Sequence, residues 1–261
     1  MGRRRGFTLI ELLVVISIIS ILMAVLMPAL QRVKDQARMT TCRSNLRNYA
    51  LIGRMYSDDN SGKFPYSFGW LYSRNNGTGC TWHDKSKNLD LHPEYAGVMW
   101  SYLKGQKINL CPTFATVARQ MSCYMCRGAT IGIDPQYGYT MNSYLNGDAW
   151  GSVPAQYHPK IKDLTMESQV KEPARTFYFG EENSWAIPGI SAAGINDNNL
   201  RSTPNGQTDC FATFHKPPSG DLNNGVSFAA FVDGHVEFVT PYPKGNTFVL
   251  SWPAEKPGPV F

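Results

Sequence analysis

An almost uninterrupted apolar segment near the N-terminus constrains this chain more than any other feature. It covers Phe7–Leu30 and carries no charged side chain between Glu11 and Pro28. A helix over this segment would be roughly 36 Å long, more than the thickness of about 30 Å of a bilayer core. The basic residues Arg3–Arg5 precede it and favour a cytoplasmic N-terminus. We therefore expect a single membrane span, with the rest of the chain on the other side of the membrane.

Glu11 is unusual for a simple membrane anchor. A carboxylate inside hydrocarbon costs about 2.5–3.5 kcal/mol and normally has a partner and a function. One explanation is that Glu11 lies near the membrane edge and reaches water. The other is that it pairs with a positive charge, because two charges that are costly to bury alone become tolerable as a pair. The residues around Glu11 favour the second explanation.

The segment Arg5–Leu13 reads RGFTLIELL and closely resembles the leader of type IV prepilins and type II secretion pseudopilins. The resemblance implies that a prepilin peptidase cuts after Gly6 and methylates the new N-terminus at Phe7. It also implies that Glu11 pairs with the N-terminal ammonium of a neighbouring subunit and sets the stagger between subunits. Pro28 lies where many of these helices carry a proline, at which a helix can bend.

A cleaved secretory signal peptide is the competing explanation of a basic segment followed by an apolar one. Such a signal needs small residues before the cut at the end of the apolar region. The best candidate, Leu22-Met23-Ala24, is poor at its first position. A signal peptide also has no need for Glu11, so we favour the prepilin-type leader.

The helix should continue beyond Pro28 to about Ser57, followed by a stop at Asp58–Gly62. Residues spaced by three and four positions place one face of this second half against the head: Cys42, Leu46, Tyr49, Gly53 and Tyr56. We therefore expect a leader at 1–6, a long helix at 7–60 and an extracytoplasmic head at 61–261. Within the helix, 7–30 would form the membrane span or the filament core.

The composition indicates a loop-rich head. Charged residues make up 17% of the chain, and glycine, proline and aromatic residues are abundant, which suits a β or α+β fold. Three of the arginines behind the net charge of +5 lie in the leader. No basic stripe appears in the rest of the chain, so we expect no nucleic-acid partner.

The head is expected to contain an antiparallel sheet packed on the second half of the long helix, an α+β fold like that of pilins. A helix is predicted at Pro93–Leu103 and loops at 120–160. A two-residue hairpin turn is predicted at Asp233–Gly234. Strands are predicted at five places: Thr176–Phe179, Cys210–Phe214, Val226–Val232, His235–Thr240 and Thr247–Trp252.

Six cysteines occur, and all are candidates for disulfide bonds: Cys42, Cys80, Cys111, Cys123, Cys126 and Cys210. An even number in an exported chain favours disulfides. A zinc site made of Cys80, Cys111, Cys123 and Cys126 is the alternative, but the paired C-x-x-C spacing is missing. The sequence does not fix the pairing. We expect Cys42 to bond to Cys111, tying the stalk to the head, and no metal to be bound.

The resemblance extends into the head. Several segments are similar to a large group of pseudopilin-like proteins abundant in planctomycetes, verrucomicrobia and their relatives: Ala37–Pro65, Leu110–Pro112, Tyr137–Asn142, Phe214–His215 and Val232–Val236. The stretches 66–109 and 180–209 match no pattern of the group.

Two groups of residues invite a search for chemistry in the head. His215, Asp233 and His235 suggest a metal site or an acid–base pair, but the turn already explains Asp233 and its neighbours. Asp58–Gly62 and Asp221–Gly225 are rich in oxygen ligands, yet neither has the spacing of an EF-hand loop. A helix stop and a turn are the favoured explanations, with calcium as the alternative. We expect no other cofactor and no enzymatic activity.

Together these features predict a structural subunit of a type II secretion pseudopilus or a type IV pilus-like filament. The resemblance implies as partners the prepilin peptidase, other pilin or pseudopilin subunits, the inner-membrane assembly platform and membrane lipid. The protein would span the inner membrane once, with its N-terminus in the cytoplasm and its head in the periplasm or outside the cell, before it enters a filament. The alternative function is a membrane-anchored envelope binding module that does not polymerise.

Overall fold

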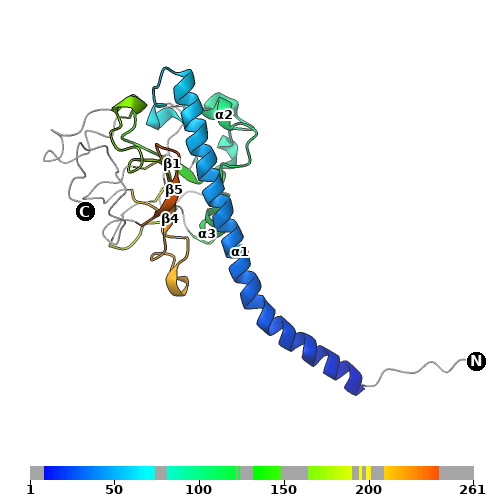
Figure 1. Cartoon of the computed structure of the whole chain (residues 1–261). Helices are drawn as coiled ribbons and strands as arrows, with labels where there is room; N and C mark the ends of the chain where they lie inside the picture. Colours follow the sequence, from blue (N-terminus) through cyan, green and yellow to red (C-terminus); the bar gives the residue numbers. More distant parts are fainter. Residues whose placement is uncertain are drawn as a thin grey trace, which may run out of the picture.

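A long helix dominates the structure, which is a computed structural model that describes residues 9–73, 81–121, 123, 132–147, 164–189, 194–195, 198–200 and 209–240. The helix α1 covers Leu9–Asp59 without a break and contains Pro28. Its N-terminal part projects away from the head, and its C-terminal part lies along it (Figure 1). The helix ends at Asp59, two residues after the predicted Ser57 and within the segment 7–60 assigned to the long helix. Gly62, with φ of 78°, donates its N–H to the carbonyl of Ser57 at 2.8 Å.

A five-stranded sheet forms the centre of the head, with strand order β3-β1-β2-β4-β5. Its strands are β1 Tyr139–Asn142, β2 Phe177–Glu181, β3 Asn199–Leu200, β4 Ser227–Phe231 and β5 Val236–Val239. All pairs are antiparallel except the short parallel pair of β1 with β3. The α+β architecture predicted from the sequence is therefore confirmed: a long helix packs against a mostly antiparallel sheet.

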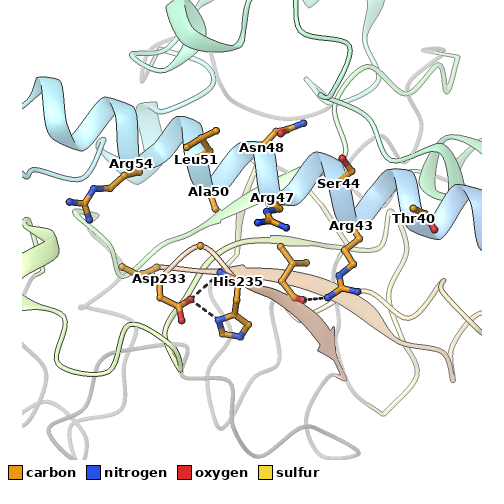
Figure 2. Close-up of a pocket in the computed structure, with 13 residues that line it drawn as sticks. Thr40, Arg43, Ser44, Arg47, Asn48, Ala50, Leu51, Arg54, Asp233 and His235 are labelled. Atoms are coloured by element: carbon orange, nitrogen blue, oxygen red, sulfur yellow. Dashed lines mark hydrogen bonds and ion pairs between the residues drawn. The ribbon is translucent and has the colours of Figure 1, made fainter.

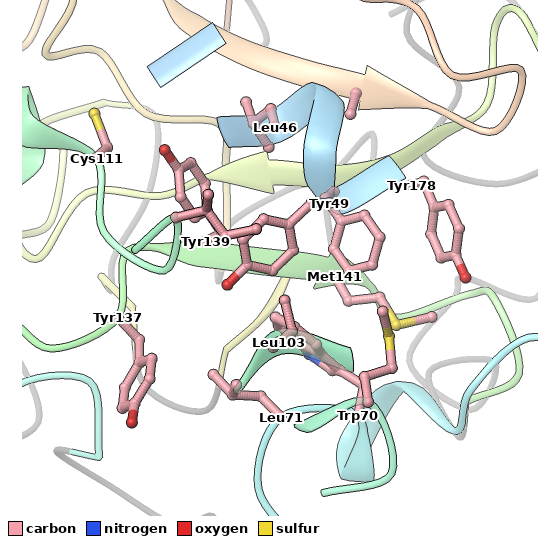
Figure 3. Packing of buried hydrophobic residues seen from close by; sticks show 14 of the residues in the cluster. Leu46, Tyr49, Trp70, Leu71, Leu103, Cys111, Tyr137, Tyr139, Met141 and Tyr178 are labelled. Atoms are coloured by element: carbon pink, nitrogen blue, oxygen red, sulfur yellow. The ribbon is translucent and has the colours of Figure 1, made fainter. Parts of the chain in front are cut away.

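The aromatic ring of Tyr49 lies where α1 meets the sheet (Figure 3). Its centroid is 5.0 Å from that of Tyr139 on β1 and 5.4 Å from that of Phe179 on β2. Its hydroxyl donates to Asn109 Oδ1 at 2.7 Å, and burial raises its pKa well above the ordinary value. The predicted buried face of the helix is confirmed, since Cys42, Leu46, Tyr49 and Gly53 are all buried.

A β-bulge in β2 shapes this interface. Phe177 pairs with Phe231, but Phe179 pairs with the adjacent Ala230, so Tyr178 is the extra residue on β2. The bulge breaks the alternation of side chains. Phe177 thus joins a small cluster with Leu200, Phe211, Ala229, Phe231 and Val239, whereas the next two aromatic residues join the main core with α1.

Two short helices pack beside α1. The helix α2 covers Trp100–Leu103 and α3 covers Pro112–Ala118, with Pro112 in its first turn. Short 3₁₀ turns lie at Ser67–Gly69, Lys85–Lys87, Pro93–Tyr95, Glu167–Gln169 and Pro218–Gly220. The predicted helix Pro93–Leu103 is thus split, because the intervening Gly97 donates its N–H to Leu71 at 2.7 Å.

Three predicted strands are confirmed and one needs correction. The predictions at Thr176–Phe179 and Val226–Val232 correspond to β2 and β4, and the prediction at His235–Thr240 corresponds to β5. Cys210–Phe214 was predicted wrongly: only Phe211 makes a β-bridge, to Glu182. Thr213 instead donates its N–H to the side chain of Asn183 at 3.1 Å. The side-chain oxygen of Asn183 therefore accepts the hydrogen bond that a backbone carbonyl of a neighbouring strand would otherwise accept.

The remaining corrections concern loops. The strand β1, which lies between β3 and β2, falls inside the region 120–160 that was predicted as loops. Its four residues are all buried, and turn-forming neighbours hid them in the sequence. The predicted two-residue hairpin is a longer loop: Phe231 N–H donates to His235 O, Gly234 N–H donates to Phe231 O, and φ is positive only at Gly234. The predicted strand Thr247–Trp252 lies outside the described residues.

Candidate assembly helix and neighbouring sites

The projecting part of α1 exposes a long apolar surface. Its large hydrophobic side chains from Leu9 to Leu30 range in exposed fraction from 85% at Leu9 to 45% at Val15. A soluble surface does not normally expose apolar area of this extent, and such an area indicates contact with lipid or protein. α1 is long and apolar enough to cross a membrane, and none of its most apolar window is buried against the head.

The polar groups within this apolar segment are arranged to suit a low-dielectric environment. Ser17 Oγ donates to the carbonyl of Val14 at 2.8 Å, and Ser20 Oγ donates to the carbonyl of Ile16 at 2.7 Å. Each hydroxyl is thereby satisfied by its own helix, as polar side chains in membrane helices require. Neither serine needs water or a partner helix.

Glu11 is the charged residue of the segment. It lies in the first turn of α1, where a negative charge interacts favourably with the helix dipole. Gly6 and Phe7 lie outside the described residues. The roles predicted for these three residues and for Pro28, which sits within the continuous helix, remain predictions.

A groove of about 1110 Å³ lies between the polar face of α1 and the turn that joins β4 to β5 (Figure 2). Arg43 donates to the carbonyl of Val236 at 3.3 Å. Arg54 pairs with Asp58 at 3.1 Å and with Glu167 at 2.9 Å. Arg47 lies between these two arginines on the same side of the helix. Arginine side chains therefore line the helical wall of this groove, and the charge of Arg54 is balanced by two carboxylates.

Asp233 and His235, two of the three residues predicted as a candidate site, lie together on the far wall of the groove. Asp233 Oδ1 accepts from the backbone N–H of His235 at 3.1 Å and contacts its Nδ1 at 2.6 Å. The imidazole stacks on the ring of Phe231, with centroids 4.3 Å apart. These contacts hold the hairpin loop together. His215, the third member, is buried elsewhere in the head.

The oxygen-rich segments are also used within their own turns. Asp58 pairs with Arg54, and Asp59 Oδ2 accepts from the hydroxyl of Tyr102 at 2.7 Å. That hydrogen bond raises the pKa of Tyr102. Asp221 accepts from the backbone N–H of Asn223 at 3.0 Å and from the side chain of Asn224. These contacts suit the helix stop and the turn, which were the favoured explanations.

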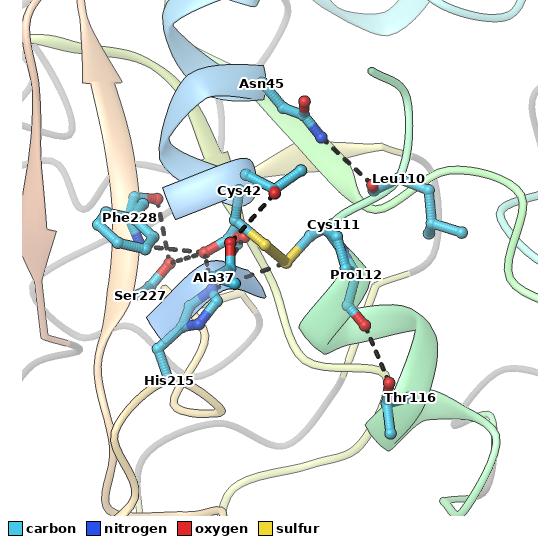
Figure 4. The surroundings of a disulfide bond; sticks show 12 residues. Ala37, Cys42, Asn45, Leu110, Cys111, Pro112, Thr116, His215, Ser227 and Phe228 are labelled. Carbon is cyan, nitrogen blue, oxygen red and sulfur yellow. Dashed lines mark hydrogen bonds and ion pairs between the residues drawn. A yellow bond between two sulfur atoms is a disulfide. The ribbon is translucent and has the colours of Figure 1, made fainter. Parts of the chain in front are cut away.

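A disulfide joins Cys42 of α1 to Cys111, the residue before α3 (Figure 4). This is the pairing expected from the sequence, and it ties the stalk to the head. Because Cys111 bonds to Cys42, the structure does not support the alternative four-cysteine zinc site. Cys123 and Cys210 are buried, and Cys80 and Cys126 lie outside the described residues.

A buried pair that the sequence analysis did not identify lies beside this disulfide. His215 Nε2 contacts Glu181 Oε2 at 3.0 Å and Cys111 Sγ at 3.7 Å. Both side chains are inaccessible to solvent. Burial, followed by the nearby Glu181 carboxylate, raises the pKa of Tyr139 well above its ordinary value. The sequence singled out His215 with other partners, and the only signal for Glu181 was its place directly after the apolar residues of β2.

Comparisons with known proteins find one family motif and one curated relative. The model of the prokaryotic N-terminal methylation motif matches residues 1–27. The type IV wide pilus major component PilA4 of Thermus thermophilus is 44% identical over 61 residues, which are 23% of this chain and 47% of the relative. The chain thus spans about half the length of this curated relative. No solved structure matches the chain.

The motif and the exposed helix support the same conclusion. The motif match includes most of the apolar segment, and from Leu9 onward that segment forms the projecting part of α1. A membrane-anchored protein follows from the two together. The chain is thus similar to type IV prepilins at the matched residues, and its long helix packed on a mostly antiparallel sheet is the pilin-like architecture expected from that similarity.

Proposed function

We propose that this chain is a structural subunit of a pilus or pseudopilus, assembled through the N-terminal half of α1. The observation that supports this most strongly is that one helix has two different environments. From Leu9 to Leu30 its apolar side chains are exposed, whereas from Cys42 to Ser57 one face is buried in the head. Such a helix can exchange lipid for neighbouring helices while its head stays folded.

In this proposal, residues 1–6 are a leader that the prepilin peptidase removes after Gly6, and Phe7 becomes the methylated N-terminus. The head, 61–261, lies outside the cytoplasm. The membrane holds the subunit until the assembly platform adds it to a filament. Glu11 then pairs with the Phe7 ammonium of a neighbour, because each charge is too costly to leave alone in a low-dielectric filament core.

The first test is the intact mass and the N-terminal peptide of the protein isolated from its native membrane. We expect a chain that starts at methylated Phe7. A chain that retains Arg3–Arg5 would contradict prepilin-type processing. A chain that starts beyond Ala24 would identify a cleaved signal peptide instead, and would contradict membrane anchoring as well.

The groove beside α1 favours a second candidate function, in which the head of an anchored, non-polymerising protein binds an envelope polysaccharide or protein. Arg43 and Arg47 along one wall would suit an anionic group. The two functions differ in what surrounds the apolar helix. A lone anchor is surrounded by lipid, whereas a filament subunit is surrounded by copies of α1.

Crosslinking in intact cells separates the two functions. We expect a photoreactive residue at Ile16 or Leu22 to give a ladder of multimers. The same residue at Leu91, which lies on the head and is 71% exposed, is the matched control and should give no such ladder. Monomers alone at Ile16 and Leu22 would contradict assembly and favour the anchored binding module.

A further inference from the structure

Four potential metal ligands converge in the interior of the head: Cys42, Cys111, Glu181 and His215. All four are buried, and their donor atoms lie within 4.8 Å of one another. They come from α1, from the start of α3, from β2 and from the segment that bridges His215 to Val226. Figure 4 shows His215 beside the two sulfur atoms. We propose that these four residues bind a divalent transition metal, most suitably Zn²⁺, when the two cysteines are reduced.

The distances fit a tetrahedral zinc site. Zinc binds sulfur at about 2.3 Å, nitrogen at about 2.0 Å and oxygen at about 2.0–2.2 Å. Ligand atoms around one ion are therefore about 3.3–3.8 Å apart. His215 Nε2 is 3.7 Å from Cys111 Sγ and 3.0 Å from Glu181 Oε2. These two separations are close to the required values and all four donor atoms lie within 4.8 Å of one another, but the two bonded sulfurs must move apart.

The surroundings of Glu181 resemble those of a metal-ligating carboxylate. Its Oε2 accepts from the backbone N–H of Phe228 at 3.0 Å and from Ser227 Oγ at 3.4 Å. Hydrogen bonds of this kind orient a ligand and hold it in position before the metal arrives. Because the carboxylate is fully buried, its presence in an apolar core carries a desolvation cost that a bound cation would offset.

His215 is directed into the same cluster. The polar contacts of its Nε2 are with Glu181 and Cys111, and within the described part of the chain its Nδ1 has no hydrogen-bond partner. The rings of Phe214 and Phe228 lie 4.8 and 5.0 Å from the imidazole. This apolar shell excludes water and strengthens bonds between a cation and thiolates.

The metal and the disulfide exclude each other, because both need the same two sulfurs. A dithiol reductant supplies two electrons and two protons and converts the disulfide into two thiols. Zinc binding then releases the two protons as both thiolates bind the ion. A disulfide oxidant reverses the sequence: it accepts two electrons, the bond between Cys42 and Cys111 forms again, and Zn²⁺ leaves. In either state α1 stays linked to the start of α3.

The experiment compares two redox states of the full chain, purified in detergent and freed of metal. Zn²⁺ is added to the oxidised and to the reduced protein, unbound ion is removed, and zinc is measured by elemental analysis together with free thiols. Co²⁺ is added to parallel samples to detect the thiolate-to-cobalt charge-transfer absorption. We expect the reduced protein to bind one Zn²⁺ ion per cluster and the oxidised protein to bind none there. The reduced protein loaded with Co²⁺ should show the absorption typical of tetrahedral thiolate ligation.

Substitutions then assign the ion to this cluster. Glu181→Gln and His215→Gln should each weaken zinc binding by at least tenfold, the effect expected from loss of a ligand. Cys210→Ser and His235→Gln, which change a buried cysteine and a histidine outside the cluster, are the matched controls and should bind as the wild type does. Near-ultraviolet circular dichroism of each oxidised variant checks that the head is folded.

Two results would overturn the proposal. One is a reduced wild-type protein, with its thiols titrated, that binds neither Zn²⁺ nor Co²⁺. The other is undiminished binding in a variant that carries both Glu181→Gln and His215→Gln, since the ion would then lie at other cysteines. The comparison of redox states needs no substitution, so it decides the question even if a variant fails to fold.

Discussion

Gly53 of α1 lies directly against the aromatic ring of Tyr178 on β2. A Cβ atom at position 53 would be 2.5 Å from Tyr178 Cε1 and 2.9 Å from its hydroxyl oxygen. The bulge in β2 accounts for this contact, since it places Tyr178 in the core next to Phe179, with their rings stacked at 4.3 Å. The absence of a side chain at position 53 therefore sets how closely the stalk approaches the sheet.

We predict that Gly53→Ala destabilises the head. In an isolated helix the change would be favourable by about 1 kcal/mol, but overpacking of a filled core costs about 1–3 kcal/mol. The denaturation midpoint of the detergent-solubilised chain should fall. Asn48→Ala, at an exposed position of the same helix, should leave the midpoint unchanged or raise it. A higher midpoint for Gly53→Ala would show that Tyr178 moves aside easily.

Replacing Cys42 and Cys111 together by serine should lower the stability of the oxidised head by about 4 kcal/mol. The disulfide closes a loop with a sequence separation of 69 residues, and the estimate follows from the loop entropy that it removes from the unfolded chain. Tryptophan fluorescence in denaturant, with a chelator present to exclude metal, measures the change. Cys210→Ser is the control. An unchanged midpoint would mean that packing alone attaches α1 to α3.

Glu11→Ala should leave membrane insertion and leader cleavage intact but reduce filament assembly. Removing the carboxylate makes the helix more apolar, so it inserts readily, but the Phe7 ammonium of the neighbouring subunit loses its partner. The yield of sheared filaments and the mass of the membrane-bound subunit measure the two steps. Ser17→Ala, which removes a hydroxyl bonded within its own helix, is the control. A normal filament yield for Glu11→Ala would exclude the pairing.

The stability of the head should fall as the pH falls below about 6.5. Burial lowers the pKa of His83 from its ordinary value of 6.5, although the hydrogen bond to Gly132 opposes the shift. Below pH 6.5 the unfolded chain takes up a proton at this residue, whereas the folded chain stays neutral until its own lower pKa is reached. Between the unfolded-state and folded-state pKa values of His83, the free energy of unfolding therefore falls by up to about 1.4 kcal/mol per pH unit. Below the folded-state pKa this loss stops.

His83→Gln should flatten this part of the curve of stability against pH. The measurement is the denaturation midpoint at several pH values, from neutral to about two units below the ordinary histidine pKa. His92→Gln, which changes a more exposed histidine paired with Glu94 at 3.0 Å, is the control and should preserve the slope. An equal slope in wild type and His83→Gln would show that the buried imidazole does not govern acid sensitivity.

Local patterns in the sequence predicted the elements that depend on nearby residues. The buried face of α1 followed from three- and four-residue spacing, and Ser61 and Gly62, with φ of 59° and 78°, terminate the helix where turn formers cluster. The loop before His235 was placed correctly but assigned the wrong type. Only the hydrogen bonds of Phe231 reveal that Val232 belongs to the loop with Asp233 and Gly234.

The sequence by itself determined that this chain carries a long helix with an apolar first half, because helical periodicity and membrane hydropathy are properties of neighbouring residues. The tertiary structure decided which residues from distant segments meet. Glu181 and His215 are 34 residues apart in the chain, and no spacing rule joins them. Their meeting depends on strand register, where a shift of one residue turns every side chain to the other face of the sheet.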